Sequence, residues 1–167
     1  SKKIEQTYGV QKKKIQYQEG EEYYRSKGYV YCNMGMLPGE YNETNQFRGL
    51  DGKNWEIDET QAGYVKKIAE LCKQKGSELV MVTAPIALVS MDYIQNYDKI
   101  HQKMAALAEE VHANYIDYNV INQQIGMLTN ENFRDDAHLN DSGVQIVDRH
   151  FINWLTENTS FFAKDRQ

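Results

Sequence analysis

Two short apolar runs, each preceded by a helical pattern, constrain the fold more than any other feature. The run over 79–84 is almost unbroken and is ended by Pro85, and a second run covers 115–118. An apolar, β-branched run that directly follows a helix is typical of a buried parallel strand. Because parallel strands need crossover connections, the order helix, strand, helix, strand predicts an α/β fold with a parallel sheet.

Three helices are predicted around these strands. The first begins after Asp58, which suits an N-cap, and ends at Gly76; its apolar positions 62, 65, 68, 69 and 72 recur at helical spacing. The second is predicted over about 92–114. The third begins at Asp141 or Ser142 and is the most hydrophobic of the three, so we expect it to dock firmly on the sheet.

The first third of the chain is different in character. Residues 1–27 have runs of like charge and predict a polar helix or an irregular arm, 29–34 is prone to form a strand, and 35–56 is rich in turn residues. We therefore divide the chain into an insertion-like arm and long loop, 1–57, and an α/β domain, 58–167.

The number of predicted strands is small for this fold class. Open doubly wound sheets hold about five or six strands, whereas here two are clear and the run at 29–34 is a third candidate. A sheet this narrow leaves strand edges and hydrophobic faces exposed. Either strands are hidden in 1–57, or another chain supplies them, or part of the natural protein is absent. We expect self-association through the incomplete sheet edge.

Composition excludes several function classes. The net charge of −5, from 24 acidic and 19 basic residues, argues against a nucleic-acid partner. No apolar run approaches the roughly 20 residues of a membrane span, so a membrane anchor is expected only if one lies upstream. The sequence contains no nucleotide-binding loop motif, and its four histidines are not spaced as metal ligands. Cys32 and Cys72 are expected to be unpaired thiols. We expect no metal and no cofactor.

The richest stretch for chemistry is 132–143, just before the last helix. Asp135 lies three residues before His138, a spacing that lets the carboxylate reach back to the imidazole in a turn. A carboxylate on one ring nitrogen fixes the tautomer and leaves the other nitrogen outward as a base. Asp136 is either a competing partner or a turn former. The alternative is that both aspartates shape a turn while His138 fills a polar niche. His101, on the second predicted helix, is expected to face solvent.

The wider pattern resembles the carboxyl-terminal portion of the SGNH (GDSL-like) hydrolase and acyltransferase superfamily, in its extracytoplasmic bacterial branch. The likeness covers roughly 58–158 and depends most on a terminal F-x-D-x-x-H-L-N-x-x-G segment, formed here by Phe133, Asp135, His138, Leu139, Asn140 and Gly143. It implies a three-layer α/β/α, flavodoxin-like fold whose short parallel sheet is incomplete in this chain. It also implies that Asp135 and His138 are the acid and base of a Ser-His-Asp triad, and that the protein is extracytoplasmic or at the cell surface.

The nucleophile of that family is not recognisable in this sequence. No Gly-Asp-Ser or Gly-Ser-Ser element follows a strand, and the Gly and Asn blocks of the oxyanion hole are not identifiable. Ser90 lies after the strand at 79–84 without a supporting motif, and Ser142 is better explained as a helix cap. The resemblance implies that the first strands and the nucleophile lie upstream in a longer protein.

Two functions therefore remain open. The first is an SGNH-type ester hydrolase or O-acyltransferase acting on acylated cell-surface glycans or small esters, which without its nucleophile has negligible activity as this polypeptide alone. The alternative is a non-catalytic α/β binding or assembly domain of the cell envelope, in which the Asp135–His138 pair is structural.

Overall fold

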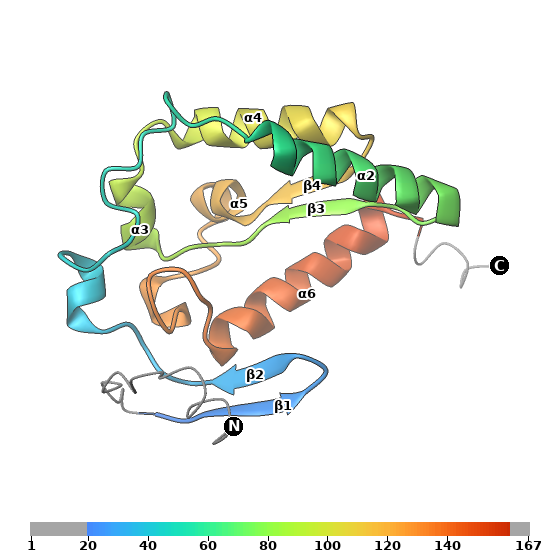
Figure 1. Ribbon diagram of the computed structural model, residues 1–167. Helices are drawn as coiled ribbons and strands as arrows, with labels where there is room; N and C mark the ends of the chain where they lie inside the picture. The colour runs from blue at the N-terminus through green and yellow to red at the C-terminus, as the bar shows by residue number, and fades with distance from the viewer. Residues whose placement is uncertain (1–19, 161–167) are drawn as a thin grey trace, which may run out of the picture.

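The computed structural model describes residues 20–160, so most of the predicted arm, 1–19, and the end of the chain, 161–167, lie outside it. The described part is mixed α/β (Figure 1). Its strands are β1 (Glu22–Ser26), β2 (Tyr29–Cys32), β3 (Val80–Thr83) and β4 (Asn114–Asp117). Its helices are α2 (Glu59–Lys75), α3 (Leu88–Tyr93), α4 (Tyr97–Glu110), α5 (Tyr118–Ile125) and α6 (Asp141–Asn158), with 3-10 turns η1 (Pro38–Tyr41) and η2 (Asn130–Asn132). Over 20–160, no helix combines the length and the apolar character that crossing a membrane requires.

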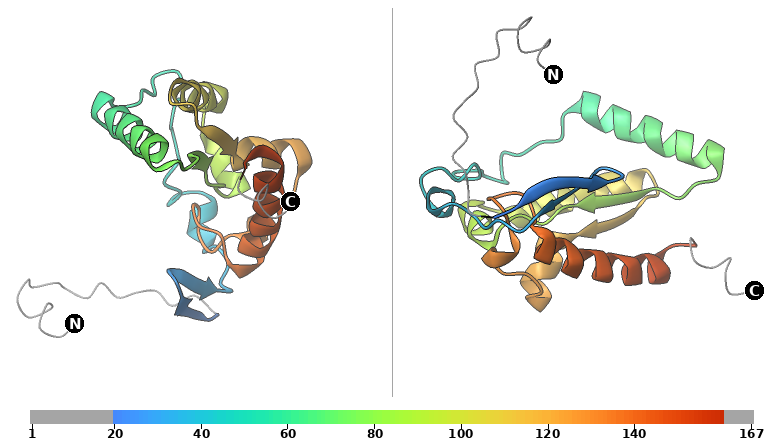
Figure 2. Two further views of the ribbon diagram at one scale, coloured as in Figure 1. Left: turned by 90° about the vertical axis from the view of Figure 1, so that its right-hand side faces the viewer. Right: turned by 90° about the horizontal axis from the view of Figure 1, so that it is seen from below.

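The predicted parallel strand pair is confirmed. β3 and β4 form a two-stranded parallel sheet in register from Val80↔Asn114 to Thr83↔Asp117. Helices α4 and α6 lie on opposite sides of this pair (Figures 1 and 2). The sheet is less buried than the apolar run predicts, since Val82 in β3 is 46% exposed.

The first two strands form a separate antiparallel hairpin. The strand predicted near 29–34 is present as β2, but it pairs with β1 and adds nothing to the parallel sheet. The prediction of a polar helix or irregular arm is wrong for 22–26. Lys27 and Gly28 have positive φ values of 50° and 86°, which suit a tight hairpin turn, and Tyr23 stacks on its cross-strand partner Tyr31.

Helix α2 has the predicted ends, but its apolar face is not buried. The Asp58 side chain accepts hydrogen bonds from the backbone N–H groups of Thr60 and Gln61, and Gly76 ends the helix with a φ of 65°. No residue of α2 is buried, and Ile68 is 51% exposed. The periodicity predicted an apolar face correctly, but it carried no information about whether a packing partner was present.

The single helix predicted over 92–114 is wrong. The chain forms α3 and α4 instead, with a break at 94–96 where Asn96 has a φ of 57°. At the break the backbone bonds to a distant loop: Gln95 N–H donates to Leu50 O at 2.8 Å, and Gly52 N–H donates to Gln95 O at 2.7 Å. Helix α5 was not predicted; the strand was predicted over 115–118, but Tyr118 is the first residue of α5.

The last helix begins at Asp141, within the predicted range, but its cap differs from the prediction. The N-cap is Asn140, whose side chain accepts from Gly143 N–H, so the assignment of Ser142 as the cap is wrong. The expectation of firm docking is also wrong, because Gly143 is the buried residue of α6 and Ile152 is 53% exposed. The start of the helix packs near a small core of Ala87, Leu128 and Phe133, against which Leu139, Ile146 and Val147 pack.

Candidate functional site

The loop that carries Asp135 and His138 is closed at its base. Phe133 and Leu139 form an antiparallel bridge, and Arg134 N–H donates to His138 O at 2.9 Å. Phe133 is fully buried in the small core, and Leu139 packs against the same core. The turn between them is therefore anchored on both sides by apolar burial.

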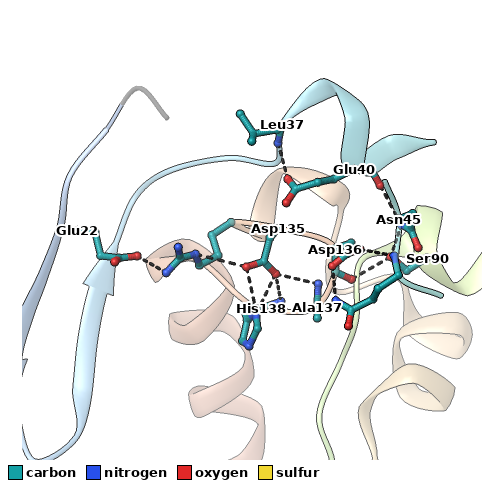
Figure 3. Close-up of polar contacts among 11 residues, drawn as sticks. Glu22, Leu37, Glu40, Asn45, Ser90, Asp135, Asp136, Ala137 and His138 are labelled. Carbon is teal, nitrogen blue, oxygen red and sulfur yellow. Dashed lines mark hydrogen bonds and ion pairs between the residues drawn. The ribbon is translucent and has the colours of Figure 1, made fainter. Parts of the chain in front are cut away.

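Asp135 and His138 are in direct contact within this turn (Figure 3). The His138 Nδ1 lies 2.8 Å from Asp135 Oδ1 and 3.0 Å from Oδ2. Oδ1 also accepts from the backbone N–H groups of His138, at 2.7 Å, and Ala137, at 2.9 Å, which fixes the carboxylate. Because an ionised carboxylate only accepts, this contact favours, in the neutral ring, the tautomer that carries the proton on Nδ1 and leaves the lone pair on Nε2. The His138 side chain is 72% exposed, so this nitrogen is accessible.

Asp136 has a different role from its neighbour and does not compete for His138. It is buried, and its carboxylate accepts from Gln46 N–H at 2.7 Å and from Gln46 Nε2 at 2.5 Å. Its carbonyl accepts from Ser90 Oγ at 2.9 Å and from Ala87 N–H at 3.3 Å. Ala87 follows the end of β3 closely, so these bonds hold the loop near the carboxyl end of that strand. This is the end of a parallel sheet at which α/β proteins bind their ligands.

Two acidic side chains from outside the loop lie near its charged residues. Glu22 of β1 forms an ion pair with Arg134, whose Nε lies 3.5 Å from Asp135 Oδ2. Burial raises the pKa of Glu40 in η1, and the negative charges of Asp135 and Asp136 add to the rise, while the Leu37 N–H and the Arg134 guanidinium oppose it. The site is thus rich in carboxylates that repel one another.

Neither Ser90 nor Ser142 contacts the His138 ring. Ser90 is fully buried, donates to Asp136 O and accepts from Asn45 Nδ2 at 2.9 Å. Ser142 Oγ donates to Asn140 Oδ1 at 2.6 Å. Over residues 20–160 no hydroxyl or thiol hydrogen-bonds to the His138 ring, whose ring partner is Asp135.

A second histidine–aspartate pair was missed from the sequence. His101 Nδ1 lies 2.9 Å from Asp117 Oδ2, so the expectation that His101 faces solvent is wrong. Asp117 is buried at the carboxyl end of β4 and also accepts from Tyr97 and Tyr115 hydroxyls. The signal available was the four-residue spacing of Tyr97 and His101, which puts both on one helix face.

The Asp117 cluster is a polar network rather than an open site. Asn119 Nδ2 donates to Tyr97 Oη at 2.8 Å and to Ala84 O at 3.2 Å, so the network links α4, β4 and the chain after β3. Burial raises the pKa of Tyr115 to about 12 and also raises the pKa of Tyr97, and the nearby Asp117 charge adds to both. Neutral tyrosine donors are therefore favoured around the carboxylate.

The described residues form no recognisable metal centre. Between residues 20 and 160, no three or more His, Cys, Asp or Glu side chains are grouped so that they could hold a metal ion. Cys32 and Cys72 are free thiols, as predicted.

Comparisons with known proteins do not identify a family for this chain. No protein-family model, no curated protein and no solved structure matches it.

Proposed function

We propose that this chain provides the acid–base half of an SGNH-type ester hydrolase or O-acyltransferase of three-layer α/β/α fold, acting outside the cytoplasm on acylated glycans or small esters. In this proposal His138 Nε2 accepts the proton of an attacking hydroxyl, and Asp135 holds the ring in the required tautomer. The nucleophile comes from outside residues 20–160.

The observation that carries the proposal is the geometry of the His138 ring. Asp135 contacts Nδ1 at 2.8 Å, while the side chain is 72% exposed. A histidine that only filled a polar niche would have its ring covered by neighbouring residues. The loop also lies beside the chain that leaves the carboxyl end of β3, through the bond from Ala87 N–H to Asp136 O, where an α/β active site is expected.

A non-catalytic binding or assembly domain is the second candidate, and one observation favours it. Asp135 accepts two backbone N–H groups of its own turn, from Ala137 and His138. Such bonds stabilise a turn whether or not the histidine reacts. The two candidates differ in whether the His138 ring is held in one tautomer with an available Nε2.

The tautomer of His138 tests the proposal directly. Above the pH at which the ring deprotonates, we expect nitrogen NMR shifts to show the proton on Nδ1 and a lone pair on Nε2. Asp135→Ala should release this preference, because the acceptor that selects Nδ1–H is removed. A His138 ring that carries its proton on Nε2 in the unmodified protein would contradict the base assignment.

Hydrolysis of p-nitrophenyl acetate by this polypeptide should be negligible, since a triad without its nucleophile loses most of its rate. His138→Ala should leave the slow background rate almost unchanged. Robust turnover that disappears in His138→Ala would reveal a nucleophile in this chain and would overturn that part of the proposal.

We also propose that the chain self-associates through the edge of β3 that does not face β4. Asn114 N–H donates to Leu79 O, and parallel ladders use alternate residues, so the N–H and C=O groups of Val80 and Val82 point to the other edge. Light scattering should show a dimer or larger species at high concentration. Val82→Pro, which removes an outward N–H, should shift the protein toward monomer, whereas Val82→Thr, which keeps it, should not. A strict monomer would contradict this proposal.

A further inference from the structure

The Asp135–His138 pair is connected to the β1–β2 hairpin by a chain of charged contacts. Glu22 of β1 pairs with Arg134, and Arg134 Nε lies 3.5 Å from Asp135 Oδ2. Asp135 in turn contacts His138, as Figure 3 shows. Two different groups therefore share the carboxylate of Asp135. Its Oδ1 accepts the backbone N–H groups and faces Nδ1 most closely, while its Oδ2 faces both the ring and the guanidinium.

The charges around this pair are mostly negative. Glu40 is close enough to Asp135 and Asp136 for their charges to raise its pKa, and Arg134 opposes that rise. The carboxylate that contacts the imidazole itself is that of Asp135. The carboxylate groups in question are those of Glu22, Glu40, Asp135 and Asp136; the cation placed among them is the guanidinium of Arg134.

We infer that Arg134 is a positioning residue for His138, and that Glu22 holds Arg134 in place from the hairpin. The guanidinium lies 3.5 Å from the second oxygen of Asp135 and offsets part of its charge, and it thereby helps to hold the carboxylate that orients the ring. The functional meaning of this inference rests on the proposed role of His138 as a base. The electrostatic coupling itself does not, because it can be measured in the chain without any reaction.

The coupling can be tested by following the His138 Cε1–H resonance against pH by NMR. In Arg134→Gln, loss of the positive charge should raise the midpoint of the His138 titration by about 0.5 pH unit at low salt. Arg134→Lys keeps the charge but loses the planar fork, so it should recover part of the shift. The difference between the unmodified protein and Arg134→Gln should shrink in 1 M salt, because the ring is exposed and ions screen the interaction.

Two further variants separate coupling from general effects. Lys103→Gln removes a cation that pairs with Glu56 elsewhere on the surface, and it should leave the His138 midpoint unchanged. Glu22→Ala should lower the {¹H}–¹⁵N NOE of Arg134 Nε, since the hairpin partner that restrains the side chain is lost.

The inference is overturned if Arg134→Gln leaves the His138 midpoint within about 0.1 pH unit of the unmodified protein, a change far below that expected for losing a nearby charge. The inference is also overturned if Lys103→Gln shifts the His138 midpoint as much as Arg134→Gln does. An unchanged midpoint together with the Nδ1–H tautomer would reject the role of Arg134 and leave the proposed base intact. The expected shift of the His138 midpoint in Arg134→Gln, together with the Nε2–H tautomer, would support the coupling to Arg134 and reject His138 as the proposed base.

Discussion

Asp117→Ala is expected to lower the free energy of unfolding by about 3–5 kcal/mol, because it leaves several buried donors without an acceptor. The carboxylate accepts from the Tyr97 hydroxyl at 3.0 Å, from His101 Nδ1 at 2.9 Å and from the Tyr115 hydroxyl at 3.2 Å. It also caps α5, accepting the backbone N–H groups of Asn119 and Val120. One substitution would therefore release the start of α5 and three side chains, two on α4 and one on β4 itself.

Urea unfolding followed by circular dichroism measures this loss. Asp98→Ala is the matched control, since Asp98 lies in the first turn of α4, 64% exposed, and its ion-pair contact to Lys99 is 4.0 Å long. It should cost about 0.5 kcal/mol or less. A loss below about 1 kcal/mol for Asp117→Ala would mean that the network relaxes or admits water, and that it does not tie α4 to β4 as described.

Gly143→Ala should destabilise the protein by about 2–3 kcal/mol, although alanine is the better helix former, because the site has no space for a side chain. A Cβ at this position would lie 2.3 Å from Asn132 O and 2.7 Å from Leu139 Cδ2. The carbonyl of Asn132 also accepts from Asn140 N–H at 3.0 Å, next to the cap of α6. Relief of the clash would push the start of α6 away from the loop that carries His138.

The same substitution elsewhere in the chain should have the opposite sign. Gly63 lies within α2, and a Cβ there would meet nothing within 4 Å. Gly63→Ala should therefore raise the free energy of unfolding by about 0.5–1 kcal/mol, through helix propensity alone. Thermal unfolding of the two variants beside the unmodified protein decides the matter. If Gly143→Ala is as stable as the unmodified protein, the close contact with Asn132 does not constrain the fold.

One part of the candidate site could be predicted from the sequence, and another part could not. Asp135 and His138 are three residues apart, so a single turn brings them together, and the spacing alone indicated the contact. Gly143 was identified from the sequence only as part of the segment that resembles the family motif. The physical reason for a glycine there, a backbone carbonyl 11 residues earlier in the chain, is visible only in the packed structure.

Contacts between distant segments could not be predicted. Gln46 holds Asp136 across 90 residues of sequence, and Glu22 reaches Arg134 across 112. His101 was expected to face solvent because its own helix gave no reason for burial, whereas Asp117, on another element, turns it inward. Hydrogen-bonding capacity is evident from a side chain, but the partner depends on which elements the fold brings together.

The sequence by itself determined the local structure: the cap at Asp58, the stop at Gly76, the strand pair β3–β4, the start of α6 and the Asp135–His138 turn. These features depend on interactions within a few residues or on the apolar character of a short run. Only the tertiary structure decided that α2 buries none of its residues, that the helix predicted at 92–114 breaks at Asn96, and that the β1–β2 hairpin lies against the loop with the histidine. Burial and long-range hydrogen bonds are properties of two surfaces in contact, and a local pattern describes only one of them.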